Sequence, residues 1–194
     1  MKTHHAHRGS NGRMDAIELL KQGHRDVAEL FSYFDASEAD DRRFIAEMIC
    51  RALTTHAQIE DEIFDPVVRD ALGAEAADLL DQAKVEHESL ATLIEEIRSS
   101  SLGGELFAAR VKVLKDYVKH HVRQEEHGLF PKVKGSGLDL HALGAALVER
   151  QHDLEPAATS LNRSPSRRVA PRRARTSVHR VATANAASTA ESPL

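Results

Sequence analysis

Apolar residues recur at alternating steps of three and four positions in four segments of the chain. This spacing places a continuous apolar stripe along one face of a helix, which then packs against neighbouring helices. Each stripe also contains one histidine. The stripes are Ile17, Leu20, His24, Val27, Phe31 and Phe34; Ile45, Ile49, Ala52, His56, Ile59 and Ile63; Leu80, Ala83, His87, Leu90, Ile94 and Ile97; and Phe107, Val111, Leu114, Val118, His121, Glu125 and Leu129.

Short segments rich in turn-forming residues separate these stripes. They lie at residues 35–41, at Pro66 and Gly73, at 99–104 and at 131–137. Short connections place consecutive helices side by side and antiparallel. The pattern therefore predicts an all-α fold, an antiparallel up-down-up-down four-helix bundle, followed by a shorter fifth helix from about Leu138 to Leu154.

Composition agrees with a helical fold and excludes several classes of protein. The chain has 194 residues, of which 41% are apolar, with no tryptophan, two tyrosines and six phenylalanines. Such a composition favours one helical domain over a sheet protein. Cys50 is the only cysteine, so neither an intrachain disulfide nor a thiolate cluster can form. Without a run of roughly 20 apolar residues or a signal peptide, we expect a cytoplasmic protein with no membrane association.

Charge is distributed unevenly along the chain. Residues 156–194 contain seven arginines and one acid, whereas residues 1–155 contain 19 basic and 29 acidic residues. We expect residues 1–13 to be a flexible N-terminus, 14–155 to form the bundle, and 156–194 to be a basic disordered tail. The tail carries charge that suits nucleic acid, but no aromatic residues lie between its arginines to stack on bases. We expect a solvated extension there, and nucleic-acid binding only through this tail.

The histidines are the unusual feature of the apolar stripes. A buried imidazole leaves a donor and an acceptor to satisfy, and a lone one is usually a core residue with local partners. Four histidines, one per helix, indicate a shared site. His56 and His121 are each followed at the fourth position by a glutamate, Glu60 and Glu125, which lies on the same helix face. Two such pairs among twelve histidines is close to the chance number, so the pairs alone prove little.

A repeat gives the pairs more weight. The sequence His-x-x-x-Glu-acid is followed by a proline ten residues after the histidine in both cases, Pro66 and Pro131. His24 precedes His56 by 32 residues and His87 precedes His121 by 34. Each helical hairpin thus supplies one histidine from its first arm and a His-x-x-x-Glu pair from its second. Measured from the turns, all six groups reach a common layer of the core.

Two buried carboxylates in one layer require positive charge. Imidazole and carboxylate donors suit iron, manganese or zinc, and two carboxylates able to bridge suit a pair of ions. Six protein groups are too few to saturate two six-coordinate ions. Positions would remain for water, dioxygen or peroxide.

The six positions resemble the haemerythrin-like HHE cation-binding family over residues 15 to 131. The resemblance implies two iron ions bridged by Glu60, Glu125 and an oxo or hydroxo group, with His24, His56, His87 and His121 as terminal ligands. Oxygen-carrying members have a fifth histidine where this chain has Ala91. Their last carboxylate lies five residues after its histidine, at the position of Glu126, but the repeat favours Glu125. These departures favour a reactive centre over an oxygen store.

Other residues are weaker candidates. Tyr117, one turn before His121, is either an extra ligand or redox-active neighbour of the site or an aromatic residue at the bundle edge. Asp61 and Glu62 are expected to face solvent or to orient His56. A ferritin-like site would need Glu-x-x-His pairs, and only Glu149 and His152 fit. His120, His127, His141 and His152 are candidates of low priority, and His4, His5 and His7 are expected to be residues of the N-terminal tail.

The predicted function is that of a non-haem di-iron protein. We expect it to bind or reduce dioxygen, peroxide or nitric oxide in sensing or stress response, either as a catalase-like or nitric oxide reductase-like enzyme or by binding alone. One alternative is an iron-sensing or metal-storage module without turnover, whose helices are ordered by the metal. Another is a structural bundle whose core histidines have local partners.

Overall fold

The computed structural model describes residues 14–100, 104 and 106–154. The predicted flexible N-terminus, 1–13, and the predicted basic tail, 156–194, lie outside these residues. Every regular element within them is a helix. In chain order the elements are α1 (Ala16–Ala36), α2 (Ala39–Ile59), η1 (Glu60–Phe64), α3 (Asp65–Leu72), η2 (Gly73–Glu75), α4 (Ala77–Ser99), α5 (Phe107–Gln124), η3 (Glu125–Leu129), α6 (Phe130–Gly135) and α7 (Leu140–Leu154).

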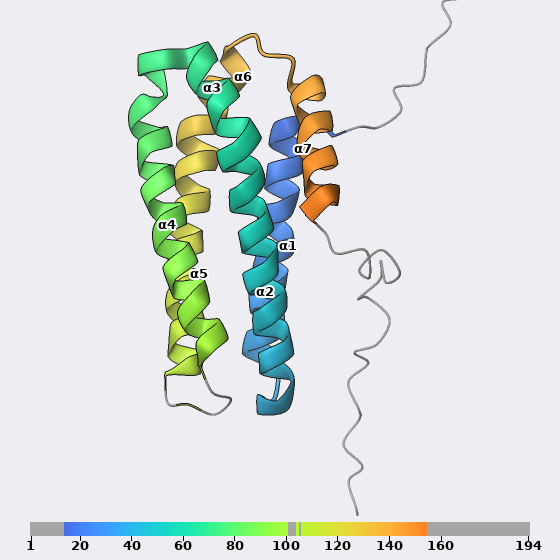
Figure 1. The fold of residues 1–194 in the computed structure, drawn as a ribbon, viewed down its shortest axis with the longest axis vertical. Coiled ribbons are helices and arrows are strands. Elements are labelled where there is room, and N and C mark those ends of the chain that lie inside the picture. The colour runs from blue at the N-terminus through green and yellow to red at the C-terminus, as the bar shows by residue number, and fades with distance from the viewer. Residues whose placement is uncertain (1–13, 101–103, 105, 155–194) are drawn as a thin grey trace, which may run out of the picture. The chain divides into compact units, whose positions relative to one another are not determined.

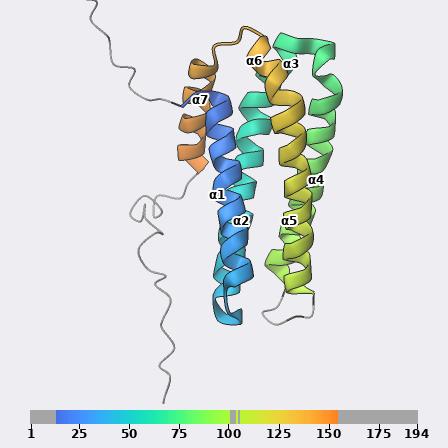
Figure 2. The same ribbon diagram turned by 180° about the vertical axis from the view of Figure 1, so that it is seen from behind.

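Two antiparallel hairpins, α1 with α2 and α4 with α5, pack together as a four-helix bundle (Figures 1 and 2). The short helices α3 and α6 lie at the same end of the bundle, and α7 lies beside α1 and α2. The all-α prediction, with a short fifth helix, is confirmed. The Asp15 side chain begins α1 by accepting a hydrogen bond from the Glu18 backbone N–H.

Three of the four predicted apolar stripes are buried as expected, and the second is displaced. The inward face of α2 carries Ala46, Ile49, Cys50 and Leu53, whereas Ile45 is only half-buried. Helix α2 contacts α1, α4 and α7, so its buried face is wider than a stripe that faces one partner. Tertiary packing therefore sets the orientation of α2.

The buried apolar side chains form two separate clusters along the bundle. One lies toward the α1–α2 turn and includes Phe31, Ile49 and Ile94. The other lies toward α3, α6 and α7 and includes Leu20 and Phe64. Each of the four striped histidines falls between the two clusters, so the core contains one polar layer bounded by apolar packing on both sides.

One π-helical turn interrupts the second arm of each hairpin, beginning at its glutamate. The N–H of Asp65 donates to the carbonyl of Glu60, and the N–H of Phe130 donates to that of Glu125, each five residues earlier. Pro66 and Pro131, which have no N–H to donate, follow directly. The sequence predicted breaks at Pro66 and Gly73 and at residues 131–137. The helical turns continue past both prolines into α3 and α6, because the widened turns accommodate the rings, and they end at Leu72 and Gly135.

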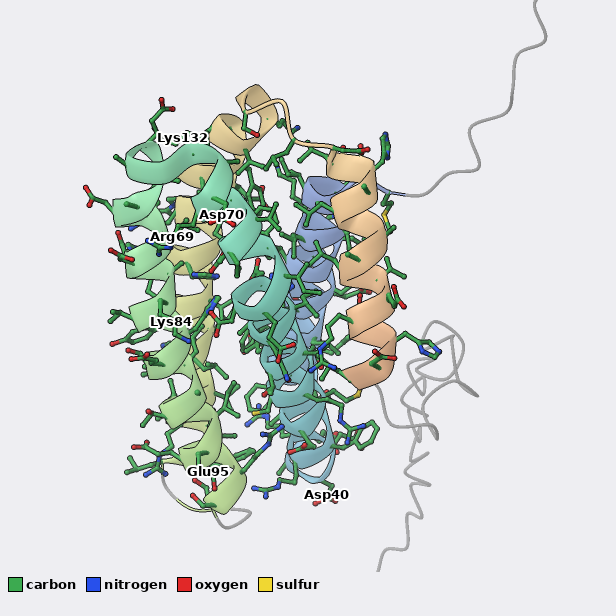
Figure 3. The ribbon with its side chains drawn as sticks, turned by 45° about the horizontal axis from the view of Figure 1, so that its top comes forward. Asp40, Arg69, Asp70, Lys84, Glu95 and Lys132 are labelled. Atoms are coloured by element: carbon green, nitrogen blue, oxygen red, sulfur yellow. The ribbon has the colours of Figure 1, made fainter. Side chains whose placement is uncertain are left out.

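Charged side chains such as Lys84, Glu95 and Lys132 project outward from the bundle (Figure 3). Within the residues that the structure describes, no helix is long and apolar enough to span a bilayer.

Candidate metal centre

The structure brings all six predicted ligands into the polar layer. Glu60 is 0% exposed and Glu125 3% exposed, and His24, His87 and His121 are also buried. His56 is the least covered, with 12% of its side chain exposed. The glutamates come from the π turns and the histidines from the four long helices, so each hairpin contributes three groups.

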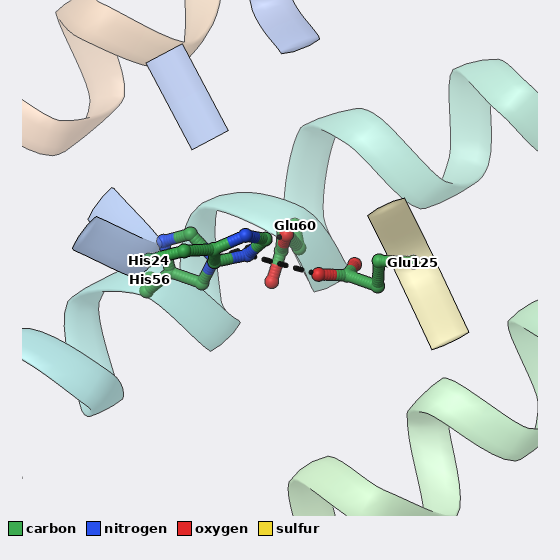
Figure 4. Close-up of side chains that lie close together, drawn as sticks. All are labelled: His24, His56, Glu60 and Glu125. Carbon is green, nitrogen blue, oxygen red and sulfur yellow. Dashed lines mark ion pairs between the residues drawn. The ribbon is translucent and has the colours of Figure 1, made fainter. Parts of the chain in front are cut away.

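One group of donors comprises His24, His56, Glu60 and Glu125 (Figure 4). The Nε2 atom of His24 lies 3.0 Å from Oε2 of Glu125. The Nε2 atom of His56 lies 3.2 Å from Oε1 of Glu60. Figure 4 shows the four side chains pointing toward one another.

A second group comprises Glu60, His87 and His121. The Nε2 atoms of the two histidines lie 3.3 Å apart. His87 Nε2 is 3.5 Å from Oε2 of Glu60, and His121 Nε2 is 3.5 Å from Oε2 of Glu125. Both carboxylates therefore lie between the two histidine pairs, where a carboxylate can bridge two ions.

Several of these inward-facing atoms lie close to one another but do not have the geometry of a hydrogen bond. Within residues 14–100, 104 and 106–154, the buried side-chain atoms with no hydrogen-bond partner are His24 Nε2, His56 Nε2, both carboxylate oxygens of Glu60, and Oε2 of Glu125. A buried polar atom without a partner costs about 1–3 kcal/mol, and more when charged. All five belong to the cluster and face its centre. Cations placed among them would satisfy every one, so the donor set fits a metal centre.

The outward nitrogens of three histidines are held by carboxylates. Nδ1 of His24 donates to Glu126 over 2.9 Å, and Nδ1 of His87 donates to Asp61 over 3.0 Å. Because an ionised carboxylate only accepts, these bonds hold a proton on Nδ1, so the neutral ring presents the lone pair of Nε2 to a metal. Asp61 thus orients a histidine, but that histidine is His87 rather than the predicted His56.

The third of these bonds uses a residue that the sequence did not single out. Nδ1 of His121 donates to Glu86 over 2.9 Å. Glu86 directly precedes His87 on α4, and it reaches across to α5. The sequence did show an acid directly before His87. Acids at exposed helix positions are common, however, so this alone did not identify Glu86 as a partner of His121.

Electrostatics in the polar layer follow from its paired charges. Burial opposes protonation of His121, but Glu125 and Glu86 outweigh it and raise the pKa of His121 to about 9. Burial likewise opposes protonation of His24, and Glu125 and Glu60 raise its pKa above the ordinary value. Burial opposes ionisation of Glu60, yet the adjacent His56 and His87 hold its pKa well below the usual range. The carboxylates are stabilised by positive charge on the histidines.

Asp65 is a further acidic group beside the site. Burial raises its pKa to about 8, and the charges of Glu60 and Glu125 add to the effect. Asp65 lies five residues after Glu60, where the second repeat has Phe130. Phe130 instead stacks on the ring of His24, with centroids 6.0 Å apart.

A small recess opens beside the second donor group, between α4 and the second arm of its hairpin. It has room for about one water molecule. The recess is lined by Leu79, Gln82, Ala83, Glu86, His121, Gln124, Glu125 and Leu129. Ala83, four residues before His87, lines the recess, and its small side chain leaves this space open.

The expectation for Ala91 needs correction. Ala91 is exposed, because the inward face of α4 continues from His87 to Leu90 and Ile94. Ala91 therefore lies outside the buried face of α4 that carries His87. The space next to the site is at Ala83 instead.

The weaker candidates lie away from the cluster. Tyr117 is 51% exposed on α5, which matches its interpretation as an aromatic residue at the bundle edge. Glu149 is exposed, so the structure gives no support to a ferritin-like pair. The exposed histidines are His120, His127, His141 and His152. His4, His5 and His7 fall outside the described residues.

Comparison with known proteins agrees with this fold. A crystal structure of a Hemerythrin HHE cation binding domain-containing protein from Mycobacterium kansasii has a similar fold, with a TM-score of 0.64 and 18% identity over 73% of this chain and 87% of that one. A curated relative described as a DNA nickase, from Nostoc sp., is 32% identical over 127 residues, or 63% of this chain. The aligned part spans 34% of that relative, about a third of its length.

The family assignment rests on a match that includes all six clustered residues. The profile of the Hemerythrin HHE cation binding domain matches residues 15–133. This range covers more than half of the chain, from the start of α1 to α6. The chain belongs to the Hemerythrin HHE cation-binding domain family.

Proposed function

We propose that the chain holds two iron ions bridged by Glu60 and Glu125 and that it binds or reduces dioxygen, peroxide or nitric oxide in sensing or stress response. The observation that carries the proposal is the set of inward-facing nitrogen and oxygen atoms without hydrogen-bond partners in one buried layer. His24 and His56 would hold one ion, and His87 and His121 the other. Iron in such a site supplies redox chemistry and binds small ligands at positions the protein leaves open.

The protein's own contribution is to hold the donors and to limit access. Asp61, Glu86 and Glu126 fix three of the imidazole rings. The two apolar clusters exclude bulk water above and below the layer. The recess at Ala83 has room for about one water molecule beside the second donor group, which favours small ligands over bulky ones.

Cleavage of DNA strands is a second candidate, favoured by the relative described as a DNA nickase. The arginines of residues 156–194 would provide attraction to phosphates. The burial of Glu60 and Glu125 argues against it, because a phosphodiester does not fit a recess of this size. We therefore place ligand binding first.

Replacing Glu60 with glutamine should abolish the centre. Two divalent cations held about 3.5–4 Å apart repel each other, and bridging carboxylates offset that repulsion. We expect Glu60→Gln to remain helical but to lose both ions after anaerobic loading with ferrous iron, measured as iron per chain. Its absorption should not change when dioxygen, peroxide or nitric oxide is added. The exposed neighbour Glu62→Gln is the control, and a Glu60→Gln protein that retains two irons would contradict the proposal.

Metal binding should strengthen as pH rises toward 9. The metal-free protein holds a proton on His121 below its pKa of about 9, and an ion can bind Nε2 only after that proton leaves. The association constant should rise about tenfold per pH unit between about pH 7 and 9 for each proton released, and then level off. Competition with a chelator at fixed ionic strength would measure it. A constant that does not vary with pH would disprove the linkage.

Filling the recess should slow ligand binding. Leu20 occupies the place in the first hairpin that Ala83 occupies in the second, so the bundle accommodates leucine one turn before a striped histidine. Ala83→Leu should slow nitric oxide binding to the ferrous protein by about tenfold, equivalent to about 1.4 kcal/mol in the barrier. Stopped-flow absorbance would measure the rate. The matched control is Ala91→Leu on the exposed face of the same helix, and equal rates in both variants would exclude access at Ala83.

The second candidate function is tested with supercoiled plasmid. If the chain cleaves DNA, the iron-loaded protein should convert the plasmid to open circles, and substituting alanine for Arg172 and Arg173 should reduce the rate, more so at low salt. Glu60→Gln should be inactive. An iron-loaded protein that leaves the plasmid supercoiled would remove this candidate and leave the first untouched.

A further inference from the structure

The two hairpins place matching residues around the two halves of the site. Glu126 follows Glu125 and accepts from His24, while Lys21, three residues before His24, lies 3.3 Å from the same carboxylate. Asp61 and Lys84 repeat this arrangement at His87, with 3.1 Å between their charged atoms. In both cases the second arm of one hairpin holds the first-arm histidine of the other. The site therefore has an approximate two-fold symmetry.

The symmetry fails at the second-arm histidines. His121 donates from Nδ1 to Glu86, the residue before His87. The residue before His24 is Gly23, and a Cβ atom built there would lie 2.7 Å from Nδ1 of His56. Within the described part of the chain, the carboxylate paired with His56 is that of Glu60, through Nε2, and no carboxylate holds the Nδ1 atom. The ring of His56 packs against α1 at Gly23 so closely that a larger residue there would displace the ring or the helix.

This difference bears on how firmly each pair of histidines holds an ion. A carboxylate on Nδ1 fixes the tautomer and the ring orientation and makes Nε2 a stronger donor. His87 and His121 both have such a carboxylate, whereas of the other pair only His24 does. Each pair has two histidines and shares the two glutamates, so the two pairs offer the same number of ligands. They differ in the hydrogen bonds from Nδ1 of the histidines to carboxylates.

We propose that the two metal positions are unequal, with the His87–His121 position filled first and the His24–His56 position holding an exchangeable ion. Glu86 is the positioning residue that makes the two metal positions unequal. The matching residue in the first hairpin is Gly23, which has no carboxylate. The inference rests on the proposed two-ion site and adds a means of regulation. A chain with one ion would predominate when the cation is scarce, and the second ion would join as its concentration rises.

Titration of the metal-free full-length chain with Co²⁺ tests the inference, because visible absorption reports the surroundings of each Co²⁺ ion. The wild type should bind in two steps that differ by about 10–100-fold, the usual effect of one outer carboxylate. His56→Ala should keep the first step with its wild-type spectrum and lose the second. His121→Ala should lose the first step. A His56→Ala chain without the first step would overturn the order of filling.

Variants of Glu86 test the residue itself. Glu86→Ala should weaken the first step by about 10–100-fold and merge the two steps. Glu86→Gln keeps an oxygen that can accept from His121 but removes the charge, so it should restore part of the separation. The matched control is Glu88→Ala, an exposed acid on the same helix. A separation unchanged in Glu86→Ala would refute the role of Glu86.

The outcomes separate this inference from the proposed function. A wild-type chain that binds no Co²⁺ and no iron would defeat both. A wild-type chain that binds two ions in one unresolved step would defeat the inference alone.

Discussion

The constraint on which the structure depends is the burial of two carboxylates in one layer of the core. Glu60 and Glu125 lie between two apolar clusters, where an isolated ionised carboxylate costs several kcal/mol. Positive charge must therefore share the layer. In the metal-free protein it comes from protonated imidazoles, which explains the raised pKa values of His24 and His121 and the lowered pKa of Glu60. Cations bound in the layer would supply this positive charge in place of the protons.

The π turns place the residues of each His-x-x-x-Glu-acid motif so that the glutamate is buried in this layer. Successive residues of a helix diverge by about 100°, so the glutamate of each motif can face the centre while the next acid points toward the other hairpin. Glu125 reaches the centre and Glu126 reaches His24 in this way. The prolines that follow are compatible with the turns because they need no hydrogen bond there. A short motif on one helix thus supplies both an inward donor and a support for a histidine on another hairpin.

The sequence predicted much of this because apolar periodicity and a repeat are local signals. The stripes placed the histidines at one depth, and the repeat favoured Glu125 over Glu126, in agreement with their burial. Features that depend on contacts between helices were missed or misplaced. Periodicity does not reveal that α2 has three neighbours, or that Glu86 spans from α4 to His121. It also could not show that the space beside the site lies at Ala83 and not at Ala91.

The positions at which the two hairpins differ are as informative as those at which they match. A perfect two-fold site would present two identical ions, with nothing to direct a ligand to either. Three matched positions differ: Leu20 and Ala83, Gly23 and Glu86, and Phe130 and Asp65. On the His24 side the three residues are two apolar side chains and a glycine. On the other side Ala83 leaves space, and Glu86 and Asp65 each carry a carboxyl group. The differences all act in one direction, giving the His87–His121 side both the firmer outer support and a recess beside the centre. The fold thus builds one site from two similar hairpins, and single-residue departures make its halves chemically distinct.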